Sequence, residues 1–244
     1  MPDTADQRPQ NHPGPHSIPR KLGFIEAESM QISSDMLEKV KKKVAKMLEG
    51  RDPAHDFEHI MRVYRNAEFI GKREGAEMEV LLAAALLHDI VVYPKGSSKT
   101  AKSADDSADL AEKILQEYGW PKERIDRTCY CIRTHSYSKR LIPATLEGKI
   151  LQDADRLDAL GAIGVARTFS VGGSEKRLFY NPEDPFWLSG RSPEDRQWTL
   201  DHFQAKLLKL KDSMHTHTAK AMAQERTAFM EKFIKQLRHE ISYE

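Results

Sequence analysis

The sequence has 244 residues, of which 39% are hydrophobic, which suffices for the core of one large domain or two small ones. Its 38 lysines and arginines nearly balance its 37 aspartates and glutamates, so net charge gives no sign of a nucleic-acid or membrane partner. The longest apolar run is too short to span a bilayer, and no secretory signal pattern is visible. The two cysteines form no metal quartet and favour a reducing compartment, so we expect a cytoplasmic protein.

The first part of the chain differs in composition from the rest. Residues 1–30 are rich in proline, glutamine, aspartate and histidine, with almost no apolar pattern. Such a segment cannot bury enough apolar surface to order itself, so we expect a disordered tail. Residues 31–244 carry apolar positions at helical spacing and no sustained strand-like alternation. This pattern predicts a single all-α domain after the tail.

Caps and turn signals divide this domain into helices. Ser103 is expected to cap the fourth helix, and Pro121 to open the fifth. Residues 161–173 are mostly small, with glycines at intervals. Residues 174–192 are expected to form an irregular segment without regular secondary structure. Helices are predicted from about Ser34 to Gly50, Asp56 to Gly75, Val80 to His88, Ala104 to Tyr118, Pro121 to His135, from Leu146, from Glu194 to Leu210 and from Ser213 to Leu237.

The third predicted helix is the most informative stretch. Eight apolar residues, 80–87, lead directly into His88 and Asp89. A helix that is apolar on every side is buried, and a buried imidazole and carboxylate each need a partner. A divalent cation satisfies both, whereas the simpler alternative is a helix that ends at His88 with Asp89 solvated outside it.

Two further side chains are candidates for the same site. His59 and Asp155 also sit at the edges of apolar helical faces. Two imidazoles and two carboxylates make a mixed nitrogen and oxygen site, which suits Mn²⁺, Fe²⁺, Co²⁺, Ni²⁺ or Zn²⁺ and, less well, Mg²⁺. Four protein ligands also favour an open catalytic site over a closed structural zinc site. Among these ions we favour Mn²⁺.

This ordered set resembles the pattern of the HD-domain phosphohydrolase superfamily. The amino-acid sequence around these four residues is similar to that of a bacterial branch of HD-domain hydrolases, over about residues 31–244. The stretches that carry the likeness are Ala54-His55-Asp56, Arg62-Val63, Leu86-Leu87-His88-Asp89-Ile90, His135-Ser136, Gln152-Asp153-Ala154-Asp155-Arg156-Leu157-Asp158-Ala159-Leu160-Gly161, and Asp201-His202-Phe203 with Lys206-Leu207-Leu208-Lys209-Leu210.

The resemblance implies a helical HD domain that hydrolyses phosphate esters or anhydrides, often of nucleotides. It implies that His59, His88, Asp89 and Asp155 are metal ligands, with His88 and Asp89 central to catalysis. Metal-rich members have two more histidines before the last aspartate, but here only His135 lies in that interval, so we favour one metal. His135 is then a candidate proton donor to the leaving group.

Other side chains are candidates for supporting roles. Asp158 shares a helical face with Asp155 and could orient a metal-bound histidine or pair locally, whereas Asp153 points elsewhere. Arg62 could hold a phosphate or form a structural salt bridge. A cationic loop follows Asp89, and its lysines could bind phosphates or be solvated. These lysines are Lys95, Lys99 and Lys102.

We expect a small phosphorylated substrate, and a cationic loop favours a polyphosphate over a single phosphate. Nucleoside triphosphates, cleaved to pyrophosphate and nucleoside monophosphate, are therefore the first candidates. A nucleotide phosphomonoesterase is the nearest alternative. No acidic residue follows Asp89 closely as a general acid, which leaves open a non-catalytic sensor that binds nucleotide and metal. The stretch His55-Asp56-Phe57-Glu58-His59 also matches an H-x-x-E-H metallopeptidase pattern, with Glu58 as the base.

Overall fold

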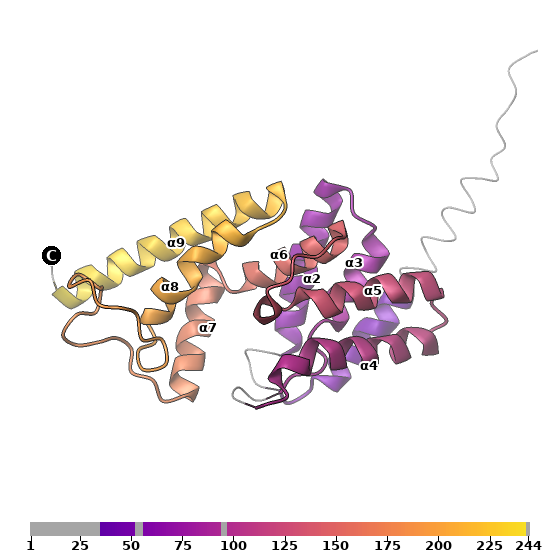
Figure 1. Cartoon of the computed structure of the whole chain (residues 1–244), viewed down its shortest axis with the longest axis horizontal. Helices are drawn as coiled ribbons and strands as arrows, with labels where there is room; N and C mark the ends of the chain where they lie inside the picture. Colours follow the sequence, from indigo (N-terminus) through magenta and orange to yellow (C-terminus); the bar gives the residue numbers. More distant parts are fainter. Residues whose placement is uncertain (1–34, 52–55, 94–96, 243–244) are drawn as a thin grey trace, which may run out of the picture. The chain divides into compact units, whose positions relative to one another are not determined.

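The computed structural model describes residues 35–51, 56–93 and 97–242, and these residues form helices joined by turns and loops (Figure 1). The described residues contain no strand, only an isolated bridge between Leu178 and Trp198, so the prediction of an all-α fold is confirmed. Residues 36–47 are helical. The helices that follow are α2 (Phe57–Glu74), α3 (Met78–Leu87), α4 (Ser103–Glu117), α5 (Lys122–His135), α6 (Leu146–Asp158), α7 (Gly161–Ser174), α8 (Asp201–Ala205) and α9 (His217–Ser242).

The predicted tail, residues 1–30, lies outside the described residues, as does Ser34, the predicted first cap. Residues from Met36 onward form one compact unit. None of the helices in the described part of the chain is both long enough and apolar enough to cross a membrane.

Helix α3 lies at the centre of the fold, in contact with α2, α4, α5 and α6. Every side chain from Val80 to Leu87 is buried, as an all-round apolar helix requires. Helix α2 packs beside it, and its limits follow the sequence closely. Asp56 accepts a hydrogen bond from the backbone N–H of His59 at 2.8 Å, and Gly75 ends the helix in the left-handed conformation. These two helices therefore fix the directions of His59 and His88.

Two capping predictions need correction, and a segment for which no element was predicted is helical. Ser103 is the first residue of α4 and not its cap, because a short 3₁₀ turn, Thr100–Lys102, leads into the helix. Pro121 precedes α5 as its N-cap residue instead of opening it. The Gly-spaced segment after α6 is itself the helix α7.

The long helix predicted from Glu194 to Leu210 does not form. The backbone N–H groups of Thr199 and Leu200 donate to the carbonyls of Leu178 and Phe179, each at 2.8 Å, so they are not available to a continuous helix. Only the short α8 and the 3₁₀ segment Leu207–Ser213 follow. Phe203 of α8 and Phe179 of the segment 175–200 both pack against Phe169 of α7.

Asp153 has a structural role at the start of α9. Its carboxylate is fully buried and accepts hydrogen bonds from the backbone N–H groups of His215 and Thr216, each at 2.9 Å, and from the Thr216 hydroxyl at 2.8 Å. This agrees with the prediction that Asp153 points away from Asp155.

We expect Asp153→Ala to lower the free energy of unfolding by about 2 kcal/mol, because it leaves buried donors without acceptors. Urea unfolding followed by circular dichroism measures the loss. Asp212→Ala, at an exposed position, is the control. Equal stabilities of the two variants would contradict this role of Asp153.

Candidate metal centre

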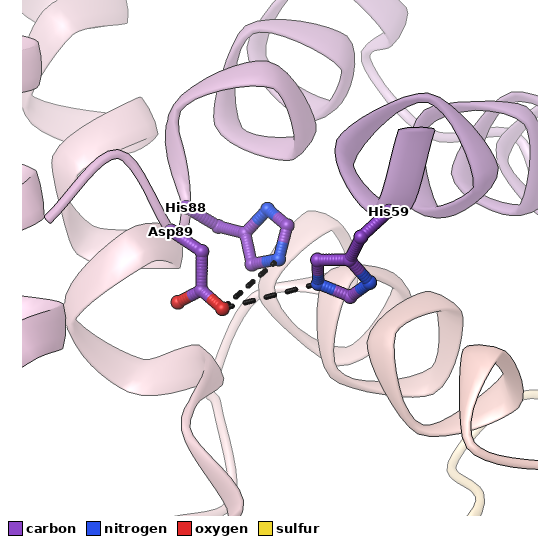
Figure 2. Close-up of side chains that lie close together, drawn as sticks. All are labelled: His59, His88 and Asp89. Carbon is purple, nitrogen blue, oxygen red and sulfur yellow. Dashed lines mark ion pairs between the residues drawn. The ribbon is translucent and has the colours of Figure 1, made fainter. Parts of the chain in front are cut away.

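Two imidazoles and a carboxylate meet where α2 faces the end of α3 (Figure 2). His59 comes from the first turn of α2, and His88 and Asp89 directly follow α3. Asp89 Oδ2 lies 3.9 Å from His59 Nε2 and 3.8 Å from His88 Nε2. Their potential ligand atoms all lie within 4.8 Å of one another, the spacing of a shared cation. We call these three residues, with Asp155, the HD cluster.

Asp155 reaches the cluster from α6, with Oδ1 at 3.7 Å from His59 Nε2. The structure thus brings together all four side chains that the sequence proposed as metal ligands. The two imidazoles are almost completely buried, whereas the Asp89 and Asp155 side chains retain 21% and 27% exposure. The carboxylates therefore form the open side of the cluster.

The hydrogen bonds of the two histidines leave their Nε2 atoms directed at the cluster. His88 Nδ1 donates to the backbone carbonyl of Ala85 at 2.9 Å, which leaves Nε2 without a proton in the neutral ring. That Nε2 atom is buried and has no hydrogen-bond partner among the residues that the structure describes. An unpartnered buried acceptor is costly, and a metal ion would satisfy it. The cluster therefore fits a divalent cation.

Asp158 holds the other histidine in place. Its Oδ2 lies 2.8 Å from His59 Nδ1, so this nitrogen donates to the carboxylate and His59 Nε2 faces the cluster. Asp158 also accepts from Arg62 Nε at 2.7 Å and from Arg167 at 2.5 Å. Burial alone would raise the pKa of Asp158, but the hydrogen bonds from His59 and Arg62 lower it well below the usual range.

The charge states around the cluster also suit a cation. Burial lowers the pKa of His88 to about 4, so the imidazole is neutral near pH 7. Burial alone would raise the pKa of Asp89, but the imidazoles of His88, His135 and His59 lower it below its ordinary value. A neutral imidazole beside an ionised carboxylate is the combination that binds a divalent metal.

His135, the last residue of α5, is buried beside Asp89 of the HD cluster. Its Nε2 lies 3.5 Å from Asp89 Oδ1, and its Nδ1 donates to the carbonyl of Ile132 at 2.7 Å. Burial lowers the pKa of His135, but the hydrogen bond to Asp89 and the negative charges of Asp89 and Asp155 together outweigh this and raise the pKa above its ordinary value. His135 is buried and does not line the cavity described next, so its position suits orienting Asp89 better than reaching a substrate.

A cavity of about 310 Å³ opens beside the HD cluster, with His59, Asp89 and Asp155 in its wall. Four basic side chains also line it: Arg156, Arg167, Arg177 and Lys206. His202, whose Nδ1 lies 2.8 Å from Asp195 Oδ2, also lines the wall, as do Asp195, Tyr137 and Thr168. The cavity can therefore accept an anionic group next to the proposed metal position.

Of the basic side chains chosen from the sequence, those in the described residues do not line this wall. Lys95 lies outside the described residues, and Lys99 and Lys102 are exposed and do not line the cavity. Arg62 forms the salt bridge to Asp158 that was its alternative. The sequence reasoning missed the four basic side chains of this wall. Arg156 lies on the predicted helix α6, Arg167 and Arg177 lie in segments for which no helix was predicted, and Lys206 lies in the predicted helix that does not form. Lys206 and His202 were nevertheless in a stretch similar to the HD branch.

The metallopeptidase pattern finds no support in this geometry. Glu58, its proposed base, is exposed on α2, whereas His59 is buried toward the HD cluster. Glu58 is also not among the residues that line the cavity beside the HD cluster. His55 lies outside the described residues.

Comparison with known proteins identifies the family. The HD domain model matches residues 56–160, which include the whole HD cluster. The chain is 35% identical over 208 residues to YpgQ of Bacillus subtilis, described as an uncharacterized protein, and the match covers 84% of this chain and 93% of YpgQ. The chain belongs to the HD-domain superfamily.

Solved structures agree with this assignment. A crystal structure of Bacillus subtilis YpgQ in complex with ADP is similar at a TM-score of 0.67 and 33% identity, covering 86% of this chain and 97% of that one. An HD-superfamily hydrolase from Bacillus thuringiensis matches at a TM-score of 0.66 and 37% identity, covering 85% of this chain and 97% of that one. The predicted HD fold is thus confirmed.

Proposed function

We propose that this HD-superfamily protein is a metal-dependent phosphohydrolase that acts on a nucleotide, with nucleoside triphosphates as the first candidates. The observation that carries the proposal is the cavity in which the HD cluster and four basic side chains face the same space. One side of such a cavity suits a divalent cation and the other suits phosphate oxygens.

The metal would be held by His59, His88, Asp89 and Asp155, with Mn²⁺ as the favoured ion for this mixed donor set. A divalent ion in such a site lowers the pKa of coordinated water and polarises a phosphoryl oxygen. The chain's own contribution is to fix the ligands, since Asp158 orients His59 and the Ala85 carbonyl orients His88.

The basic side chains would bind and orient the phosphates. Arg156, Arg177 and Lys206 come from α6, the loop after α7 and the residue after α8, so they surround the cavity from three directions. Several separated cations suit a polyphosphate better than one phosphate group. The ADP complex of the relative YpgQ supports a nucleotide as the ligand.

The test is hydrolysis by metal-depleted protein and by protein loaded with Mn²⁺, Ni²⁺, Zn²⁺ or Mg²⁺, with nucleoside triphosphates and monophosphates as substrates. We expect metal-dependent release of pyrophosphate and nucleoside monophosphate, resolved by anion-exchange chromatography. Asp89→Ala, prepared identically, controls for contaminating phosphatases. Orthophosphate released from a monophosphate would instead indicate a phosphomonoesterase. Nucleotide binding without any turnover would favour a sensor and reject the hydrolase proposal.

We expect Lys206→Ala to raise the KM for the nucleotide about tenfold, because one charge-assisted hydrogen bond contributes on the order of 1.5 kcal/mol. Lys102→Ala should leave KM unchanged, since Lys102 is exposed and does not line the cavity. Steady-state kinetics at constant ionic strength compares the two variants. A raised KM in Lys102→Ala with an unchanged KM in Lys206→Ala would instead indicate that the loop lysines bind the phosphates.

A further inference from the structure

A second cavity, of about 290 Å³, lies where α2, α9 and the corner between α6 and α7 meet. No residue lines both this cavity and the one beside the HD cluster. Three arginines line it: Arg62 and Arg65, one turn apart on α2, and Arg226 on α9. We call it the arginine cavity.

Two of these arginines are held in place by the protein. Arg226 donates to the carbonyl of Leu157 at 2.6 Å and to the side-chain oxygen of Asn66 at 2.9 Å. Arg62 is fixed by its two hydrogen bonds to Asp158. A guanidinium carries five N–H donors, so each keeps donors beyond those that anchor it. A fixed guanidinium loses little conformational entropy when it binds an anion.

Positive charge exceeds negative charge around the arginine cavity. Among the described residues that line it, Asp158 alone is acidic, and this carboxylate is already shared by Arg62 and Arg167. Within the described part of the chain, neither Arg65 nor Arg226 forms a salt bridge. Burial lowers the pKa of Arg226, and the negative charges of Asp158 and Glu225 only partly offset this. A partly buried cation without a close counter-ion is stabilised by a bound anion.

The corner before α7 leaves room for this arrangement. Gly161 has a φ of +71°, and a Cβ atom there would lie 3.2 Å from Arg226 Cγ. The N-cap residue of α7, Leu160, supplies no side-chain hydrogen bond, and residues 160–163 line the cavity. The first backbone N–H groups of the 14-residue α7 therefore have no side-chain cap and belong to residues at the cavity, where an anion would find them as further donors.

We propose that the arginine cavity is a second anion-binding site, separate from the HD cluster, for a phosphate or the phosphates of a nucleotide. The ligand class follows from the donors, because planar guanidinium groups match the oxygens of a phosphoryl anion. The site is joined to the HD cluster by one side chain, since Asp158 contacts Arg62 on one side and His59 on the other.

Isothermal titration of the full chain with inorganic phosphate at low ionic strength tests the proposal. Arg65→Glu and Ala162→Glu each place a carboxylate at the arginine cavity and should weaken one class of phosphate site at least about tenfold. Both positions are exposed, and an acidic residue in the first turn of α7 suits the helix, so folding should be unaffected. Arg196→Glu makes the same charge change at an exposed position that lines neither cavity.

Lys206→Ala, which alters only the cavity beside the HD cluster, should retain the phosphate site that Arg65→Glu removes. Equal phosphate affinity in the Arg65→Glu, Ala162→Glu and Arg196→Glu proteins would overturn the proposal. The proposal would also be overturned if Lys206→Ala lost all phosphate binding, or if the wild-type chain bound no phosphate. None of these readings depends on hydrolysis, so a failure here is distinct from a failure of the proposed activity.

Discussion

Asp158→Asn is expected to lower both the stability of the protein and its affinity for metal. The substitution keeps the size of the side chain but removes the carboxylate that His59, Arg62 and Arg167 share. Breaking a buried ion pair from one side costs about 3 kcal/mol, because the partner charges stay buried without compensation. The loss of the group that orients His59 should weaken metal binding about 10-fold to 100-fold.

Urea unfolding measures the first effect, and titration with Mn²⁺ measures the second. The lowered pKa of Asp158 fixes the pH dependence of the stability difference. A carboxyl group whose pKa is lowered by folding contributes stability above its unfolded pKa of about 3.9, and this contribution disappears as pH falls through the folded value. The difference between wild type and Asp158→Asn should thus be full at pH 7 and shrink in strong acid.

Asp155→Asn is the matched control. Asp155 lies on the same helix but is more exposed, so its change should weaken metal binding with little loss of stability. If Asp155→Asn destabilised the fold as much as Asp158→Asn, the shared ion pairs of Asp158 would not be the cause.

The HD cluster is predictable from the sequence because local signals fix each of its helices. The cap at Asp56 and the glycine at Gly75 set the limits of α2, and the unbroken apolar run sets the position of α3. The register of α6 follows from its apolar stripe, which places Asp155 and Asp158 on one face. Burial of the apolar faces determines how these helices are rotated about their axes. The side chains of the HD cluster, on the helices or directly after α3, are therefore directed toward one another.

The basic wall of the cavity is not predictable in the same way. A run of lysines near Asp89 shows local charge but not the direction in which the loop faces. The cations that line the cavity lie between residues 156 and 206, and tertiary hydrogen bonds bring their segments there. The N–H groups of Thr199 and Leu200 bind to Leu178 and Phe179, and no sequence period marks such a contact. The predicted long helix from Glu194 is wrong for the same reason.

His88→Ala is expected to lower metal-dependent hydrolysis strongly and to remove metal-dependent stabilisation. In the wild type, free metal at 100 times its Kd should add about 2.7 kcal/mol to the free energy of unfolding by mass action. His88 supplies the one buried ligand atom of the cluster that lacks any hydrogen-bond partner, so its removal should eliminate this gain. The rate of hydrolysis should fall by on the order of 10³, equivalent to about 4 kcal/mol of transition-state stabilisation.

Metal-dependent stabilisation is measured by thermal melts of the metal-free and metal-loaded proteins, and metal content by elemental analysis. His217→Ala removes an exposed imidazole at the start of α9 and should respond to metal as the wild type does. His55→Ala should retain metal, whereas Asp155→Ala should lose it. If His55→Ala lost metal and Asp155→Ala kept it, the ligand set would be wrong and the peptidase pattern would regain support. A His88→Ala protein that still gained stability from metal would place the ion elsewhere, because alanine offers no side-chain ligand at the buried centre of the cluster.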